Sequence, residues 1–298
     1  MTRFYAPLLT VAAGAVLSLL AIAASAAALP PLSDPPTNEY RPGKFVWIDL
    51  VTADVAGAEK FYGGLFGWTF AELGTGAGRY SLAYQAGLPV AGIAARPPVP
   101  GQVRTSWWIA FMSVADVDRA AADVVAKGGK VLIPARPVEG RGRMAVLADP
   151  DGAPFGLVKS SSGDPPDFQA EPGEWIWAVY QSPDATSAAA FYQDLGNYEV
   201  VPGDMVGNAA SFALQAEGYA RASLVEIPPG RTELRPEWLY FVRVDDVAAS
   251  LARAVELGGK VIAPPRPDLL EGRIAVVTDP GGGLLGLMQW DADDGEGN

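Results

Sequence analysis

The stretch WIDLVTADVAGAEKFY, Trp47–Tyr62, contains the structural unit from which the chain is built. Residues 46–51 are β-branched, aromatic or apolar apart from one aspartate, which is typical of a strand. Asp54 follows as a helix N-cap, and Ala58 and Phe61 begin a row of apolar residues at helical spacing. The stretch therefore predicts a strand, a cap and an amphipathic helix in that order.

The same unit recurs three more times, around Asp116, Asp184 and Asp246. A spacing of 62 residues separates Asp54 from Asp116 and Asp184 from Asp246, and 130 residues separate the first pair from the second. Further strand patterns follow each helix, so each unit reads as β-α-β-β-β. A repeat inside a repeat predicts two homologous domains, each made of two such modules.

Changes in amino-acid composition along the chain mark the segment boundaries. A proline-rich stretch precedes the first domain, and a stretch rich in Ser, Gly, Pro and acids separates the two domains. The predicted segments are a signal peptide (1–28), a proline-rich tether (29–43), domain 1 (44–160), a linker (161–173), domain 2 (174–290) and an acidic tail (291–298).

The N-terminal segment has the pattern of an export signal. After Arg3 no charged residue occurs until Asp34, and residues 8–28 are rich in Ala, Leu and Val and end in small residues. An uncleaved membrane anchor is the alternative, because the uncharged run is long enough to cross a bilayer. Under either interpretation the body lies outside the cytoplasm, and we expect a periplasmic or secreted protein without stable membrane contact once the signal is cleaved.

Composition excludes several classes of function. The formal charge of −12 argues against nucleic-acid binding, which needs clustered Lys and Arg. The chain contains no cysteine and no histidine, so disulfides, thiolate metal sites, cysteine nucleophiles and Ser-His-Asp triads are impossible. We expect no cofactor.

The motifs of the repeat resemble those of the vicinal oxygen chelate superfamily, the group of glyoxalases, bleomycin-resistance proteins and extradiol dioxygenases. The resemblance rests on paired β-α-β-β-β halves, the Phe-Tyr-x-x-Leu helix motif, Gly-Gly after the second helix and Asp-Pro-x-Gly before the last strand. The most specific stretch is FYGGLFGW at 61–68. The resemblance implies an α+β fold of two tandem glyoxalase-like domains, each a curled mixed sheet that encloses a cleft, with helices outside.

In metal-dependent members of this family, the ligands come from the first strand of each half and from the last strand of the domain. Carried onto this chain, the first position falls on Trp47 and Trp177, and the last, a glutamate in the family, falls on Gly156 and Gly286. The fifth-strand position falls on Trp108 or Ile109 in domain 1, and on Trp238 or Leu239 in domain 2. None of these side chains ligates a metal, so we predict a metal-free cleft. An all-oxygen site would depend on Asp49 and Glu226, the only candidate carboxylates on the strands.

Strand alternation places Phe45, Trp47, Asp49 and Val51 on one face of the first strand, and Trp177 and Gln181 on the matching face in domain 2. A cleft floored by Trp47 and Trp108, and by Trp177 and Trp238 in domain 2, suits a flat or cationic organic ligand. The alternative is that these tryptophans only fill the space.

Three other residues complete the candidate site. Arg143 and Arg273 occupy duplicated positions and either anchor an anionic ligand or form solvated ion pairs. Asp49 is the candidate catalytic base, against an ordinary role in a hydrogen bond or ion pair.

The sequence thus predicts an exported, metal-free binding protein for a small, aromatic or cationic organic molecule, a monomer or homodimer. The alternatives are a metal-independent lyase or isomerase, an oxygen-ligated metal enzyme, and a scaffold for another exported protein.

Overall fold

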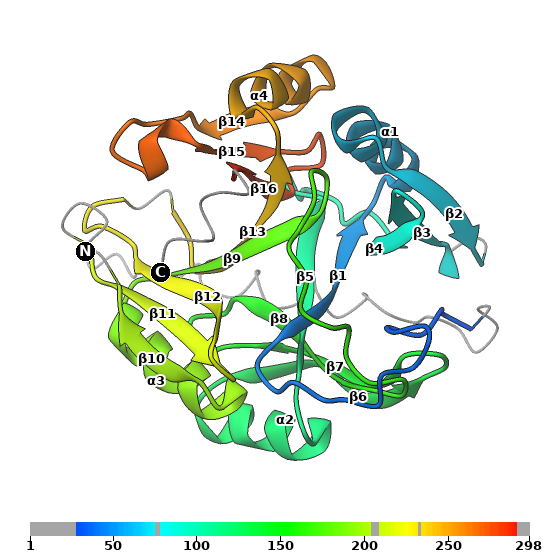
Figure 1. Cartoon of the computed structure of the whole chain (residues 1–298), viewed down its shortest axis with the longest axis vertical. Helices are drawn as coiled ribbons and strands as arrows, with labels where there is room; N and C mark the ends of the chain where they lie inside the picture. Colours follow the sequence, from blue (N-terminus) through cyan, green and yellow to red (C-terminus); the bar gives the residue numbers. More distant parts are fainter. Residues whose placement is uncertain (1–27, 75–77, 204–208, 232–233, 291–298) are drawn as a thin grey trace, which may run out of the picture.

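A computed structural model describes residues 28–74, 78–203, 209–231 and 234–290 (Figure 1). The predicted signal peptide, apart from its last residue, and the acidic tail lie outside the described residues. Within the described ranges, no helix combines the length and the apolarity needed to cross a membrane.

Each domain is one eight-stranded mixed sheet built only from its own strands, as the α+β prediction requires. Sheet 1 has the order β2-β3-β4-β1-β5-β8-β7-β6, and sheet 2 has the order β10-β11-β12-β9-β13-β16-β15-β14. The first strands of the two modules, β1 and β5, pair antiparallel at the centre of sheet 1, and β9 and β13 do the same in sheet 2. The strands of domain 1 are β1 (Phe45–Thr52), β2 (Thr69–Leu73), β3 (Tyr80–Gln85), β4 (Leu88–Ala95), β5 (Ser106–Ser113), β6 (Lys130–Val138), β7 (Gly142–Ala148) and β8 (Pro154–Ser160). Those of domain 2 are β9 (Trp175–Ser182), β10 (Glu199–Pro202), β11 (Ser211–Ala216), β12 (Tyr219–Glu226), β13 (Glu237–Val244), β14 (Lys260–Ala263), β15 (Ile274–Thr278) and β16 (Leu284–Gln289).

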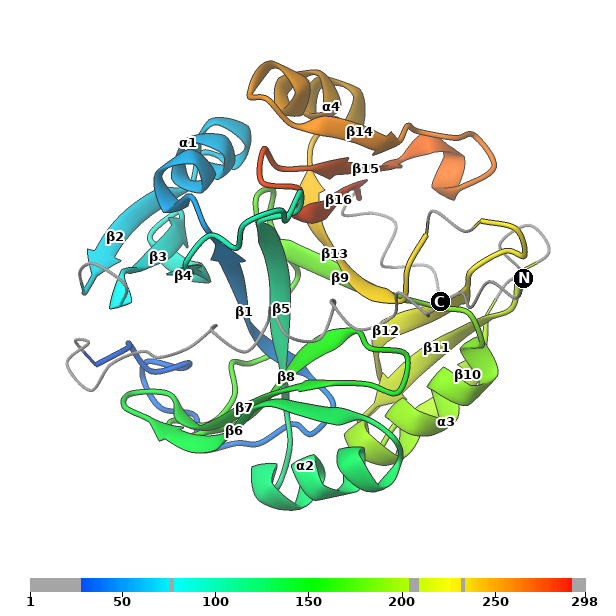
Figure 2. The same cartoon turned by 180° about the vertical axis from the view of Figure 1, so that it is seen from behind.

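The four α-helices of the described residues begin where the repeated aspartates predict. They are α1 (Val55–Phe66), α2 (Val117–Ala126), α3 (Ala185–Gly196) and α4 (Val247–Glu256), and the carboxylates of Asp54, Asp116, Asp184 and Asp246 accept a hydrogen bond from the third residue on. That bond satisfies one of the free amide groups at a helix start. Helix α1 of domain 1 lies against α4 of domain 2, and α2 lies against α3 (Figure 2).

The two domains pack through the faces of their sheets that carry the helices. One continuous apolar core joins these faces, and it includes Phe61 and Tyr62 on α1, Phe191 and Tyr192 on α3, and the inward residues of the central strands. The opposite, concave face of each sheet has its own smaller apolar cluster. In Figure 1 the two sheets curl open towards opposite sides of the molecule. The two concave faces therefore lie on separate sides of the molecule, one in each domain.

Two motifs that recur in the sequence meet across the domain boundary. The hydroxyl of Tyr62 donates to the carboxylate of Asp279 at 3.0 Å, and that of Tyr192 donates to Asp149 at 2.8 Å. Each aspartate belongs to the Asp-Pro turn of the other domain, so the Phe-Tyr helix motif and the Asp-Pro turn form reciprocal interdomain contacts.

The linker ties the domains together through Asp167. Its carboxylate accepts from Arg221 of β12 at 2.6 Å and lies 2.9 Å from the amino group of Lys44, beside β1. Burial of the carboxyl acts to raise the pKa of Asp167, but the hydrogen bonds from Arg221 and Lys44 outweigh it and lower the pKa to about 2.

This shift predicts a pH-dependent contribution to stability. Because the folded pKa lies below the unfolded value of about 3.9, the stabilisation is complete above that value and is lost as the pH falls towards 2. Asp167→Asn is expected to lower the free energy of unfolding by about 1.5 kcal/mol at pH 7, since solvent screens part of the attraction. Urea unfolding measures this. The difference in the free energy of unfolding between Asp167→Asn and wild type should become smaller as the pH is lowered from 7. The matched control is Asp268→Asn, in an exposed pair with Arg266; an equal loss at both pH values in Asp167→Asn would contradict the assignment.

Candidate ligand clefts

Trp47 and Asp49 lie on the concave face of sheet 1, as strand alternation predicts. Phe45 does not share that face, because the pairing of β1 with β5 slips between Phe45 and Trp47. The Phe45 ring packs instead on Trp238 of domain 2, with 5.0 Å between ring centroids, and Val46 joins the concave cluster. The prediction that Phe45 shares a face with Trp47 and Asp49 was therefore wrong, because of this bulge.

Trp108 and Trp238 lie on the opposite face of their sheets from Trp47 and Trp177, so they do not floor the clefts. Each is 5% exposed in the shared core, and their indole N–H groups donate to the hydroxyls of Tyr62 and Tyr192 at 2.9 Å. Strand register decides this, because Ile109 pairs directly with Asp49 and Leu239 pairs with Val179. Ile109 and Leu239 hold the fifth-strand positions.

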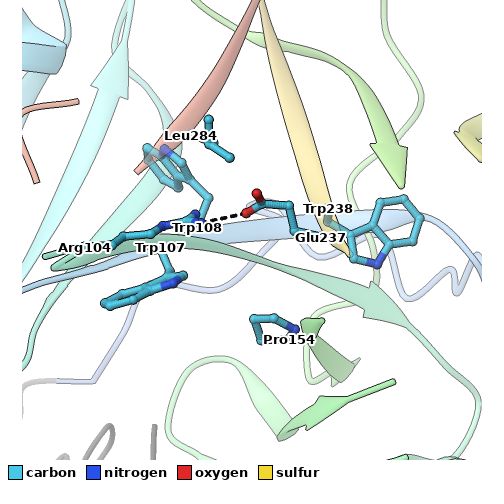
Figure 3. A pocket seen from close by; sticks show the side chains of 7 residues that line it. All are labelled: Arg104, Trp107, Trp108, Pro154, Glu237, Trp238 and Leu284. Carbon is cyan, nitrogen blue, oxygen red and sulfur yellow. Dashed lines mark hydrogen bonds and ion pairs between the residues drawn. The ribbon is translucent and has the colours of Figure 1, made fainter. Parts of the chain in front are cut away.

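Trp108 and Trp238 instead line a small hollow at the seam between the domains (Figure 3). Arg104 and Glu237 meet across it in an ion pair of 2.7 Å. The hollow holds about 280 Å³ of empty space, part of it open to solvent. Trp107, Pro154 and Leu284 complete its lining. Because both tryptophan N–H groups are already bonded to tyrosines, the seam is better explained as interdomain packing than as a ligand site.

The cleft of domain 1 contains a hydrogen-bonded group around Asp49. One oxygen of its carboxylate accepts from the Tyr80 hydroxyl at 2.7 Å and from the Trp47 indole N–H at 2.7 Å. Burial raises the pKa of Asp49, although these two hydrogen bonds and the charge of Arg141 act against that rise. Asp49 as a whole residue is nevertheless only partly buried.

Arg141 is the residue of this cleft that the sequence did not reveal. It is 1% exposed, and its guanidinium carbon lies 3.7 Å from the centroid of the Trp47 ring. It lies in the turn between β6 and β7, where Gly140 and Gly142 adopt φ of +80° and +110°. The two glycines beside it were the only sequence feature that pointed to Arg141. The prediction named Arg143 instead, because that arginine is duplicated in domain 2.

Arg143 itself forms an exposed ion pair with Asp118 of α2, which matches the plainer of its two interpretations. Domain 2 has Glu271 where domain 1 has Arg141, so the buried arginine is not duplicated.

The N-terminal tether covers part of the domain 1 cleft. Leu32 is buried in the concave cluster and Leu29 packs against it. The amide of Leu29 donates to the carbonyl of Glu139 at 3.2 Å, and the amide of Ser33 donates to the Ser162 hydroxyl at 3.1 Å. In Figure 1 this dark blue segment runs beside β6 and β7 at the open side of sheet 1. The tether therefore packs onto domain 1.

The cleft of domain 2 is more open and lacks these charges. Val179 replaces Asp49, and Ser223 replaces Gly92 as its partner on the neighbouring strand. The indole N–H of Trp177 donates to the Ser223 hydroxyl at 3.1 Å. Trp177 and Val179 remain partly exposed. The apolar lining consists of Ile176, Trp177, Val179, Leu239, Phe241, Ile274, Val276, Leu284, Met288 and Trp290.

The remaining candidates of domain 2 lie at the margins of this cleft. Gln181 is partly exposed and pairs with Glu237 across β9 and β13. The guanidinium of Arg273 lies 6.0 Å from the centroid of the Trp290 ring, and its Nε donates to the carbonyl of Leu270. Arg273 thus stands beside an aromatic residue of the lining.

Comparison with known proteins identifies the fold family. Residues 44–157 match the model of the Glyoxalase/Bleomycin resistance protein/Dioxygenase superfamily, and residues 177–288 match that of the Glyoxalase-like domain. The chain belongs to the glyoxalase/bleomycin resistance protein/dioxygenase superfamily. This glyoxalase-like chain carries two such domains in tandem, as its internal repeat predicts.

Two relatives match this chain over most of both lengths. The proposed glyoxylase CFP32 of Mycobacterium tuberculosis is 33% identical over 258 residues, which cover 86% of this chain and 98% of CFP32. The anthracycline biosynthesis protein DauV of a Streptomyces species is 32% identical, with 85% of this chain and 95% of DauV covered.

Solved structures agree at the level of the fold. The Mn(II)-bound glyoxalase from Novosphingobium aromaticivorans superposes with a TM-score of 0.54 at 16% identity, covering 84% of this chain and 83% of that one. The 2,2',3-trihydroxybiphenyl 1,2-dioxygenase of Sphingomonas wittichii gives a TM-score of 0.55 at 14% identity, with 86% and 94% covered.

The metal that such relatives bind does not fit the residues of either cleft. In domain 1 the family's ligand positions hold Trp47, Ile109 and Gly156, and a Cβ on Gly156 would collide with the Phe111 ring. Domain 2 repeats this with Trp177, Leu239 and Gly286 under the Phe241 ring. Indole, alkyl and phenyl groups offer no donor to a transition metal. The described residues also contain no cluster of three or more carboxylates that could replace them, so Asp49 and Glu226 gain no further ligands.

Proposed function

We propose that this glyoxalase-like protein binds a small, flat organic molecule on the concave face of domain 2, without a metal ion. The observation that carries the proposal is the partly exposed Trp177 within an apolar cluster on the concave face. Such a surface costs free energy in water and recovers it when a ligand covers it.

The aromatic residues of the lining favour a planar ligand. Trp177 and Trp290 are partly exposed, and each offset-stacked or edge-on ring contact contributes about 1 kcal/mol beyond area burial. Arg273 beside Trp290 and Gln181 at the margin offer polar groups for orienting the ligand. The name of the relative DauV points the same way, because anthracyclines are planar polycyclic aromatic compounds.

The proposal predicts that Trp177→Ala weakens binding of the planar probe 1,8-dihydroxyanthraquinone by about 10-fold. Loss of one stacking contact and of the apolar area beneath it accounts for roughly 1.4 kcal/mol. Quenching of tryptophan fluorescence during titration measures the dissociation constant.

The matched control is Trp47→Ala, which removes the equivalent tryptophan of domain 1 and should leave the probe's affinity unchanged. Equal affinity in wild type and Trp177→Ala would place the ligand elsewhere, and so would an equal loss in both variants.

A second candidate function is metal-independent proton transfer by Asp49, as in a lyase or isomerase. The specific observation in its favour is a carboxylate whose pKa is raised by burial, on a residue that is only partly buried. Asp49→Asn keeps the shape of the side chain but removes the base. Turnover of a carbonyl substrate by wild type, lost in Asp49→Asn with an unchanged melting temperature, would support this function.

We also propose that the protein is exported, on the basis of the uncharged apolar N-terminus that ends in small residues. Intact-mass measurement of the protein from its native host tests this directly. A mature chain that begins near residue 29 supports export with cleavage, and a full-length chain recovered from the cytoplasm refutes it.

A further inference from the structure

The guanidinium of Arg141 is buried without a hydrogen-bond partner. All three of its nitrogens are shielded from solvent and form no hydrogen bond of normal geometry within the described part of the chain, although the charges of Asp49 and Tyr80 act on the guanidinium. An arginine stays charged in proteins, so it cannot escape this cost by losing its proton. Buried charges are normally paired and hydrogen-bonded. An unsatisfied guanidinium inside a cleft therefore indicates a missing oxyanion.

The surroundings of Arg141 leave the edge of the guanidinium available for that oxyanion. Stacking on Trp47 engages one flat face of the guanidinium and none of its N–H groups. The nearest carboxylate, Asp49, is held by Tyr80 and Trp47 instead. Asp49 is a partly exposed residue, whereas Arg141 is buried.

The rest of the cleft is apolar. Beyond Asp49 and Arg141, the concave cluster consists of aliphatic, aromatic and thioether side chains, with Leu82, Ile109, Phe111, Met144 and Val146 among them. One cation within apolar walls matches a ligand that has one oxyanion and an apolar body. A planar carboxylate also matches the fork of a guanidinium, which binds it through two parallel hydrogen bonds.

We propose that the concave face of domain 1 is a second binding site, specific for a small monocarboxylate whose carboxylate is bound by Arg141 and whose apolar body packs against the walls. A phosphate dianion is disfavoured because Asp49 places a carboxylate on the same face. Domain 2 cannot duplicate the site, since Glu271 takes the position of Arg141 and is exposed. The duplicated domains have thus diverged into one charged and one apolar cleft.

Titration calorimetry of the full chain with sodium benzoate tests the site, with uncharged benzamide and inorganic phosphate as matched comparisons. Wild type should bind benzoate saturably and should bind neither benzamide nor phosphate. Arg141→Met should weaken benzoate binding by roughly 30-fold, the loss of a charge-assisted bidentate contact. Arg141→Lys should retain part of the affinity, because it keeps the charge but not the fork. The control Arg143→Met, two residues on and exposed, should bind like wild type.

Melting temperature supplies a second readout that does not depend on the probe. If Arg141 is kept for a ligand, its apolar replacement removes a buried unpaired charge, and Arg141→Met should melt about 3 °C higher than ligand-free wild type. A role confined to packing on Trp47 predicts a lower melting temperature instead. Absence of benzoate binding, equal binding by Arg141→Met, or a lower melting temperature of that variant would each overturn the proposal.

Discussion

Replacing both Tyr62 and Tyr192 by phenylalanine is expected to lower the free energy of unfolding by about 5 kcal/mol. Each hydroxyl donates to an aspartate of the other domain and accepts from a tryptophan of its own, Trp108 or Trp238. All of these groups are buried. Removing one hydroxyl leaves a carboxylate oxygen and an indole N–H without that partner, at about 1–3 kcal/mol for each group.

Urea unfolding of the single and double variants measures this effect. The two contacts lie at separate places on the boundary, so the single losses of about 2.5 kcal/mol should add. The exposed Tyr40, whose ring contacts Lys159, supplies the control, because Tyr40→Phe removes a hydroxyl that faces solvent. A double variant as stable as Tyr40→Phe would show that the two tyrosines do not join the domains.

Gly92→Ala is expected to lower the free energy of unfolding by about 3 kcal/mol, the second largest effect. Gly92 pairs with Asp49 in the sheet, and a Cβ at this position would collide with the Tyr80 hydroxyl and with the Asp49 carboxylate. Overpacking of a filled interior costs about 1–3 kcal/mol, and here it also separates a buried hydrogen-bonded pair.

The matched control for this prediction is Gly78→Ala, where a Cβ meets no described atom within 4 Å. The Tyr80→Phe change removes the colliding hydroxyl, so Gly92→Ala combined with Tyr80→Phe should lose less stability than the sum of the two single changes. Chemical denaturation of the four proteins tests this. Full additivity would mean that Gly92 does not make room for the Asp49–Tyr80 contact.

Much of the fold was predictable because local patterns and the repeat point to the same answer. The four aspartate caps, the helical stripes beginning at Ala58 and its counterparts, and the 130-residue shift predicted two domains of two modules each. The fold was well determined, since the same sequence pattern occurs in each of the four modules.

The candidate site was less predictable, because the face on which a strand residue lies depends on how the strand pairs with its neighbours. One bulge beside Val46 sends Phe45 to the interdomain core, and the pairing of Ile109 with Asp49 takes Trp108 out of the cleft. A shift of one residue exchanges the two faces of a strand, and side-chain type does not reveal it when both faces are apolar.

The sequence by itself determined the repeat, the helix starts and the family. It also determined that the side chains that ligate a metal in this family are absent. All of these depend on residue identity and on short-range spacing. Only the tertiary structure decided that the domains pack through Tyr62 and Tyr192, and that Arg141 is buried against Trp47 while Arg143 faces solvent. The latter facts depend on contacts between residues 43 to 217 positions apart or on which side of a turn a residue faces, and burial is a property of the packed chain rather than of its local sequence.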